Sequence, residues 1–305
     1  MLLFTHPACL AHDPGAGHPE CPARLEAVLH ALRAAYPALP WREAPAASRE
    51  ALRRVHTPAL ISEVLDLATD GPRRLDEDTA MSAGSPDAAL RAAGAGIAAV
   101  DAVMAGESGQ AFCAVRPPGH PATRATAMGF CLFNSVAVAA AHAVHEHGLH
   151  RVAIADFDVH HGNGSQDIFA GDPRVMYLSS HQSPLYPNTG DPAESGVGNL
   201  ANATLAPGAD SHAFRGAWKD VLLPRLEDFR PQLLLVSAGF DGHRLDPLAD
   251  LALEADDYRW LSAELAGLAG RHAQGRLVSL LEGGYSLSAL RACSVAHLQG
   301  LLDAA

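Results

Sequence analysis

The sequence predicts an α/β protein with a single, mostly parallel open sheet that carries helices on both faces. Longer helical patterns separate short apolar runs, and this alternation is typical of parallel sheets. The apolar runs have no polar alternation, as expected of strands that are covered on both faces. No Pro/Gly/Ser-rich linker divides the chain, so we expect residues 1–305 to form one domain. The predicted strands are 111–115, 152–157, 175–179, 233–237 and 277–281.

The predicted helices follow a period of 3.6 residues. The pattern over 24–36 places four apolar side chains on one face, namely Leu25, Val28, Leu29 and Leu32. Ser85, Pro86 and Asp87 combine an N-cap residue, a first-turn proline and a first-turn acid, and predict a helix that ends near residue 105. Pro224 predicts a kink in one further helix. The other predicted helices are 135–147, 212–229, 257–272 and 287–303.

Residues 181–211 are rich in Pro, Gly, Asn and Ser and are predicted to form a long loop. Four histidines, at 142, 145, 147 and 150, lie on a predicted helix and at its exit. We expect them to be solvated or to cap the helix.

The charge balance argues against direct nucleic-acid binding. The chain has 22 basic and 34 acidic residues, a formal net charge of −12, and one lysine, Lys219. Binding to a phosphate backbone needs a basic face, which this composition does not favour.

The chain shows no targeting or membrane signal. Its N-terminus has no basic region and only a short apolar run, so we expect no signal peptide. No stretch approaches the roughly 18 apolar residues of a membrane span. The five cysteines are scattered without a Cys-x-x-Cys pair, which favours reduced thiols and a cytoplasmic location.

Polar side chains follow all five predicted strands. In open α/β sheets, ligands bind beyond the carboxyl ends of the strands. The five strand ends therefore predict one shared site, built from 116–120, 156–160, 179–181, 238–241 and 282–285.

Asp158, His160 and Asp241 have the makings of a catalytic divalent metal site. Two carboxylates and one imidazole leave a coordination position for water. This donor set accepts Zn²⁺, Fe²⁺ or Mn²⁺, so the metal stays open. Asp156, two residues before Asp158, is better placed to orient an imidazole or to contact a monovalent cation. The alternative is a hydrogen-bonded structural cluster without metal.

Six segments resemble the histone deacetylase superfamily, in order and over nearly the whole chain. The class II-like branch is closest, with its bacterial histone deacetylase-like amidohydrolases and acetoin-utilization-type deacetylases. The resemblance implies an arginase/deacetylase fold and zinc-dependent removal of an acyl group from an amine, giving a carboxylate and a free amine. The segments are HDPGAGHPECPARLEA (12–27), RPPGH (116–120), GFCLFNSVAVAA (129–140), DFDVHHGNGSQDIF (156–169), SAGFDGHRLDPL (237–248) and LEGGY (281–285).

The resemblance also implies residue roles. Asp158, His160 and Asp241 become the ligands of one zinc ion, and Tyr285 becomes the phenol that stabilises the developing oxyanion. Asp156 would orient His120 and help bind a structural potassium ion. The remaining potassium ligands would be the Ser179 hydroxyl and backbone oxygens of Asp158, His160 and Ser180.

The implied substrate is an aliphatic acyl-amine, such as an acylated lysine or a small molecule. Phe130 and Tyr186 would form the walls of a narrow channel, with Gly129 alongside and Asp78 at the rim. Relatives selective for acetylpolyamines carry a glutamate where this chain has Leu248. This difference favours an uncharged distal end, and acetylpolyamine hydrolysis remains an alternative.

One position departs from the family pattern. The family has two adjacent histidines after RPPG, whereas His120 is followed here by Pro121. Asn163, at the position that partners the second histidine, loses that imidazole. Loss of a general base typically costs about 10²–10⁴-fold in rate. Three outcomes stay open: His120 performs all proton transfers, the enzyme is slow, or the pocket only binds acyl ligands.

Two further functions are alternatives. An arginase-like binuclear manganese hydrolase needs additional carboxylates near Asp158 and Asp241, where this chain has His161-Gly162 and Gly242-His243. An enzyme-derived scaffold would bind neither metal nor ligand. The sequence gives no indication of the oligomeric state.

Overall fold

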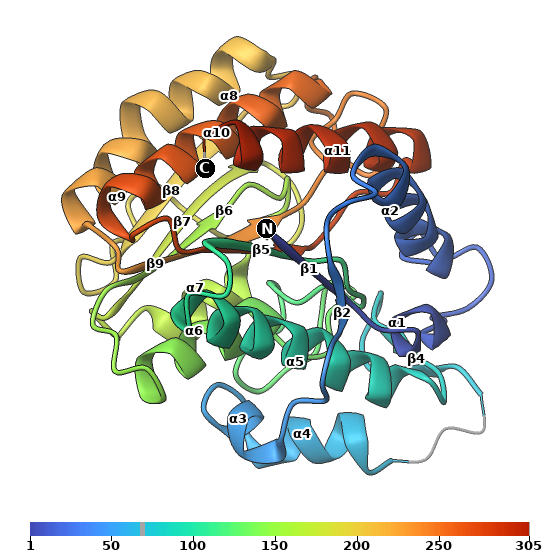
Figure 1. Cartoon of the computed structure of the whole chain (residues 1–305). Coiled ribbons are helices and arrows are strands. Elements are labelled where there is room, and N and C mark those ends of the chain that lie inside the picture. The colour runs from blue at the N-terminus through green and yellow to red at the C-terminus, as the bar shows by residue number, and fades with distance from the viewer. Residues whose placement is uncertain (68–70, 305) are drawn as a thin grey trace.

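A fully parallel sheet of eight strands forms the centre of the molecule (Figure 1). The computed structural model describes residues 1–67 and 71–304. The strand order is β2-β1-β5-β10-β9-β6-β7-β8. The strands are β1 (Leu2–Thr5), β2 (Trp41–Glu43), β5 (Gln110–Cys113), β6 (Val152–Asp156), β7 (Val175–Gln182), β8 (Leu200–Leu205), β9 (Leu233–Ala238) and β10 (Leu277–Leu281). A small antiparallel pair joins β3 (Arg73–Arg74) to β4 (Ala80–Met81).

Helices cover both faces of this sheet, as Figure 1 shows. Helices α5 and α6 pack on one face against β1, β5, β6, β9 and β10. On the other face, α10 packs on β9 and α11, and α11 packs on α2. The helices are α1 (Ala8–Ala11), α2 (Pro22–Ala35), α3 (Arg49–Arg53), α4 (Pro58–Leu65), α5 (Ser85–Met104), α6 (Ser135–His145), α7 (Asn163–Phe169), α8 (Ser211–Ala217), α9 (Leu223–Phe229), α10 (Ala255–His272) and α11 (Leu287–Asp303).

The predicted α/β class with a parallel sheet is confirmed, and all five predicted strands belong to it. The prediction of a loop over 181–211 is wrong in part, because β7 extends to Gln182 and β8 lies within that range. β8 contains the polar residues Asn202 and Thr204 and forms the outer edge of the sheet beside β7. Its backbone pairing with β7, from Tyr177↔Leu200 to Gln182↔Leu205, stabilises the strand despite this weak local pattern.

The helix predicted over 212–229 is interrupted before Pro224, whereas the predicted kink itself stays a prediction. Helix α8 continues into a single π-helical turn, η1 (Trp218–Leu222), before α9 begins. Pro224 lies in the first turn of α9, where its missing N–H donor costs little. The widened turn accommodates the proline that an uninterrupted α-helix would not tolerate.

Strand register brings the predicted polar ends to one edge of the sheet. Asp156 at the end of β6 pairs with Ser179 of β7 and Ser237 of β9. Leu281 of β10 pairs with Ala238 of β9. The segments that follow these strands therefore begin side by side.

In the described part of the chain, no helix has the length and hydropathy that crossing a membrane requires.

Candidate active site

Asp158, His160 and Asp241, the strand-end cluster, converge just beyond the sheet. His160 Nδ1 lies 3.2 Å from Asp158 Oδ1 and 3.1 Å from Asp241 Oδ2. One donor atom from each residue lies within 4.8 Å of the other two. Both carboxylates are buried, while the His160 side chain keeps 15% of its surface exposed. The three donors therefore face one point that is reached from the His160 side.

The electrostatics of this cluster favour a bound cation. Burial and the neighbouring Asp158 carboxylate both raise the pKa of Asp241. Burial alone would lower the pKa of His160, but Asp158 and Asp241 raise it to about 10. Without a metal the cluster thus holds a proton between two carboxylates. A divalent cation would replace that proton and offset the negative charge more fully, so this donor set fits a metal.

Backbone groups fix the two carboxylates. Gly283 N–H donates to Asp158 Oδ2 over 2.8 Å, and Val159 N–H donates to Asp241 Oδ1 over 2.9 Å. A Cβ at Gly283 would lie only 2.1 Å from Asp241 Oδ2, and one at Gly239 only 2.0 Å from Asp158 Oδ2. The glycines of AGFD and EGGY are therefore required by the close approach of these side chains.

His120 is oriented from behind by Asp156. Its Nδ1 lies 2.9 Å from Asp156 Oδ2, and the Tyr177 hydroxyl donates to the same oxygen over 2.9 Å. Burial lowers the pKa of His120, but Asp156 and Asp158 outweigh this and hold it well above its ordinary value. His120 Nε2 points to the strand-end cluster, 3.5 Å from Asp158 Oδ2. The sequence did not single out Tyr177, which reads as one more apolar strand residue.

A cavity of about 250 Å³ leads to the cluster. The Phe130 and Tyr285 rings meet edge to face, with centroids 5.7 Å apart. Asp246 accepts the Tyr285 backbone N–H over 2.7 Å, and Arg24 Cζ lies 4.8 Å from the centre of the Tyr285 ring. Burial raises the pKa of Tyr285 further than Arg24 lowers it, so the phenol is protonated. All five predicted channel residues line this cavity: Asp78, Gly129, Phe130, Tyr186 and Leu248.

Ser179 and Ser180 lie on β7 beside Asp156. The Ser179 hydroxyl lies 3.0 Å from His181 Nδ1, and the Ser180 hydroxyl accepts a 3.0 Å hydrogen bond from Trp218 Nε1. This position agrees with a backbone role for Ser180, and the potassium site stays a prediction.

Pro121 lines the cavity where the family pattern has its second histidine. It packs against Gly129, where an added Cβ would lie 2.8 Å from the Pro121 Cβ. Asn163, the expected partner of the missing imidazole, directs Nδ2 toward Met128 Sδ at 3.4 Å. Its Oδ1 is buried and has no hydrogen-bond partner among the described residues. Such an orphaned acceptor costs roughly 1–3 kcal/mol, and the Pro121 side chain has no N–H group that could pair with it.

A buried network that sequence reasoning missed supports the Tyr285 loop. Arg24 Nε donates to Gly284 O, and its Nη2 donates to Glu282 O over 2.6 Å. Glu20 pairs with both Arg24 and Arg116. These residues lie in the motifs HDPGAGHPECPARLEA and RPPGH. The motifs therefore marked the residues, but they did not show that the residues pair with one another. The N-terminal segment thereby fixes the loop after β10.

Glu282 joins this network to His120. Its Oε2 accepts the N–H groups of Gly119 over 2.6 Å and His120 over 3.2 Å. Burial raises the pKa of Glu282 to about 7, although nearby His120 lowers it.

Comparison with known proteins finds matches over nearly the whole chain. A family model described as "Histone deacetylase domain" matches residues 18–301. A histone deacetylase-like amidohydrolase from Pseudomonas aeruginosa is 41% identical, over 94% of this chain and 77% of the relative. A probable deacetylase from Archaeoglobus fulgidus is 37% identical, over 93% and 81% respectively. The crystal structure of the HDA15 HD domain matches with a TM-score of 0.93 at 33% identity, covering 99% of this chain and 88% of that one.

Proposed function

The chain belongs to the histone deacetylase family, and we propose that it is a zinc-dependent amidohydrolase that releases an acyl group from an acylated amine. Family membership supports the deacetylase and amidohydrolase class. The observation that carries the finer proposal is the convergence of the strand-end cluster, His120 and Tyr285 at the base of one narrow cavity. The products would be a carboxylate and a free amine.

Asp158, His160 and Asp241 would hold the metal. When bound there, zinc supplies Lewis acidity to the amide carbonyl and to a water molecule. Fe²⁺ suits the same donors. A structural potassium ion held near Asp156, Ser179 and Ser180 belongs to the same proposal.

Tyr285 stabilises the charge that develops on the carbonyl oxygen. Its phenol is protonated and lines the cavity beside His120 and His160, so it has a proton to donate there. Asp246 fixes the Tyr285 backbone, and Arg24 packs over the ring. These contacts limit the motion of the hydroxyl.

His120 transfers the proton in both steps. With Nδ1 bound to Asp156, its Nε2 accepts a proton from the attacking water and returns it to the amine nitrogen as the C–N bond breaks. A cation held by the strand-end cluster would lower the pKa of His120 again and so favour the basic form of its imidazole. One imidazole therefore does the work that two share in the family pattern.

The cavity suits an extended, aliphatic acyl-amine such as acyl-lysine. Phe130 and Tyr186 are its aromatic walls, and Leu248 puts an apolar side chain where an acetylpolyamine-selective pocket would place a charge. Asp78 also lines this cavity and would offer an acceptor for a substrate backbone.

A mononuclear site is favoured over a binuclear one. Among the described residues, three possible ligands meet at the strand ends, and one separate group of three lies elsewhere. A bridging second metal would need further carboxylates beside Asp158 and Asp241.

A second candidate function follows from Pro121 and the orphaned Asn163 Oδ1: an acyl-ligand binder with little or no turnover. It shares the metal and the channel, so only turnover separates the two candidates.

The test is metal-dependent release of the acyl group from a panel of acetyl-lysine, longer acyl-lysines and acetylated polyamines. Asp158→Asn serves as the blank. We expect turnover in the zinc-loaded protein that disappears in the blank, with the acyl-lysines preferred. Hydroxamate binding without turnover above the blank would overturn hydrolysis and support the binder.

A further inference from the structure

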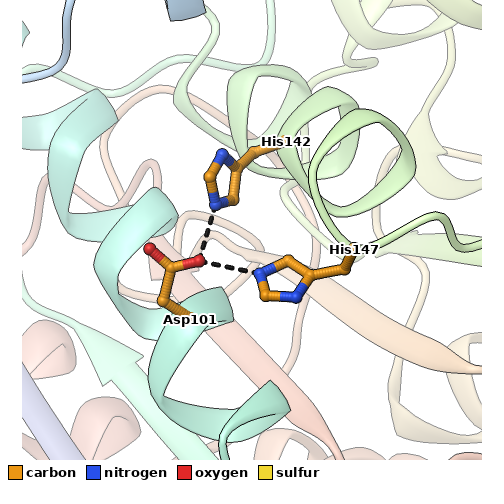
Figure 2. A group of neighbouring side chains, drawn as sticks. All are labelled: Asp101, His142 and His147. Atoms are coloured by element: carbon orange, nitrogen blue, oxygen red, sulfur yellow. Dashed lines mark hydrogen bonds and ion pairs between the residues drawn. The ribbon is translucent and has the colours of Figure 1, made fainter.

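A second group of metal-binding side chains lies on the helical face, far along the sequence from the strand-end cluster. Figure 2 shows Asp101 of α5, His142 of α6 and His147, two residues beyond the end of α6, directed at one another. We name these three residues the helix-surface cluster. Both imidazole Nε2 atoms lie 2.7 Å from the same Asp101 oxygen, Oδ1. Three donor atoms of the types that zinc prefers are therefore concentrated at one point.

Local chain geometry explains the convergence. Helix α6 ends at His145, and Gly148 adopts a positive φ of 64° at the turn that follows. His147 lies between the end of α6 and this turn, and its ring meets that of His142 with centroids 5.4 Å apart. Asp101 comes from α5, which packs beside α6. The sequence predicted solvated or capping histidines here, and it did not predict this contact.

The spacing is close to that of a coordinated ion. Ligand atoms around tetrahedral zinc, with bonds of about 2.0–2.1 Å, lie roughly 3.3 Å apart. The three donors already lie within 4.8 Å of one another. The Asp101 side chain is 52% exposed, against 12% for His142 and 25% for His147. A small outward rotation of Asp101 would open the space for an ion, while solvent supplies the fourth ligand.

The charge around the cluster is compatible with a cation. Burial raises the pKa of Asp101, but hydrogen bonds from His142 and His147 outweigh it and lower that pKa, so the carboxylate is ionised. The surrounding hollow, about 400 Å³ in volume, also holds Arg54 and Glu146, which pair with each other. That ion pair leaves the Asp101 charge as the net charge facing the two imidazoles.

We propose that Asp101, His142 and His147 bind one divalent transition-metal ion of the zinc class. Such an ion would link α5 to the end of α6 and would be separate from any ion in the strand-end cluster. The proposal does not depend on amide hydrolysis. It also means that two metal ions per chain would be no sign of a binuclear active site.

The test counts zinc on the full-length chain. Zinc content after dialysis, and competition with a chromophoric chelator, are compared for wild type, His147→Gln and the matched control His145→Gln. His145 is an exposed histidine on the same helix and lies outside the cluster. We expect two zinc ions per chain in wild type and in the control, and one in His147→Gln. The second site should weaken by at least the roughly 10–100-fold that losing a supporting contact to a ligand costs.

A second variant separates the two sites. Asp241→Asn, which removes a strand-end donor, should still bind one zinc ion, and this ion should be lost when His147→Gln is added. Equal zinc content and affinity in His147→Gln and His145→Gln would overturn the proposal and leave a hydrogen-bonded cluster. Amide turnover should not differ between His147→Gln and His145→Gln, so failure of this proposal is distinct from failure of the hydrolase assignment.

Discussion

The strand-end cluster and the helix-surface cluster use the same kinds of donor in opposite surroundings. The first joins two buried carboxylates to one imidazole, and the second joins two imidazoles to one exposed carboxylate. Burial limits the screening of the strand-end charges by water. A cavity beside this cluster also offers space for a substrate. The second lies on a helical surface, where solvent would supply the remaining ligand of a bound ion. Under the two proposals, the same kinds of ligand would support catalysis in one place and stabilisation in the other.

The two clusters also differ in how their ligands are fixed. Backbone N–H groups hold the carboxylates of Asp158 and Asp241, and glycines allow the chain to approach them. No such backbone donor to Asp101 is present among the hydrogen bonds of the described residues, so His142 and His147 alone orient it. Rigid ligands, as in the strand-end cluster, favour a defined transition-state geometry. In the helix-surface cluster, the exposed Asp101 carboxylate would need only to rotate to coordinate an ion.

The largest expected effect is on turnover. Asp241→Asn removes a strand-end ligand and should lower kcat/KM by on the order of 10³-fold or more, since a catalytic metal supplies several kcal/mol of transition-state stabilisation. Asp101→Asn, the same change in the helix-surface cluster, should leave kcat/KM unchanged. Steady-state kinetics on an acyl-lysine substrate measure both. Equal losses in the two variants would mean that the clusters are functionally coupled, contrary to this comparison.

The next effect concerns Pro121. Pro121→His would place an imidazole near the unpaired Asn163 Oδ1 and restore a second proton-transfer group. We expect kcat to rise by about 10²-fold, the lower end of what a positioned general base contributes. Pro121→Ala is the control, because it removes the ring without adding a base. A rise of the same size in Pro121→Ala would show that the ring obstructs the pocket and that no base is lacking.

Thermal stability distinguishes the clusters in a different way. After chelation, zinc added at 100 times the dissociation constant of the helix-surface cluster should stabilise the fold by about 2.7 kcal/mol. This increment should be present in Asp241→Asn and absent from the double variant Asp241→Asn/His147→Gln. Calorimetric melting over a zinc series measures it. A zinc-independent Tm in Asp241→Asn would contradict a structural role for this site.

A buried histidine without a carboxylate partner shows what burial alone does to the pKa of an imidazole, and both clusters can be compared with it. His56 Nδ1 lies 3.0 Å from Thr123 O, and its Nε2 accepts the Asn134 N–H over 2.9 Å, which selects the neutral ring. Burial lowers the pKa of His56 to about 4, whereas carboxylates raise the pKa of His160 to about 10.

His56 should therefore make the fold sensitive to acid. Its folded pKa lies below the unfolded value of about 6.5, so this contribution is complete above pH 6.5 and declines as the pH falls toward 4. In that window, His56 should change the free energy of unfolding by about 1.4 kcal/mol per pH unit. Urea unfolding between pH 4.5 and 7 measures the free energy of unfolding. This free energy should depend less steeply on pH in His56→Gln than in wild type or in the variant of an exposed histidine, His150→Gln. Parallel curves for all three proteins would exclude this contribution.

Much of the fold could be predicted because its strands carry local signals. Continuous apolar runs identified β5, β6, β7, β9 and β10, which form the inner part of the sheet. The strands missed, β1, β2 and β8, are short or polar and lie toward the two edges. Edge strands depend on backbone pairing with a neighbour, and the residues within them carry little of that information.

The strand-end cluster was predictable for the same reason. Parallel strands end at a common edge, so polar residues that follow several strands must meet there. Their partners in space were not predictable in this way. Arg24 reaches Glu282 and Gly284 across more than 250 positions of sequence, and Tyr177 reaches Asp156 only through the pairing of β6 with β7.

The sequence by itself thus determined the fold class, the edge that carries the site and the departure at Pro121. Only the tertiary structure decided that Asn163 Oδ1 finds no replacement partner among the described residues and that Asp101 meets His142 and His147. Hydrophobic periodicity and the ends of strands are properties of consecutive residues, so they can be recognised from a short stretch of sequence. Contacts between α5 and α6, or across the floor of the cavity, depend on how whole elements pack. A short stretch of sequence does not show which distant residues will pack against it.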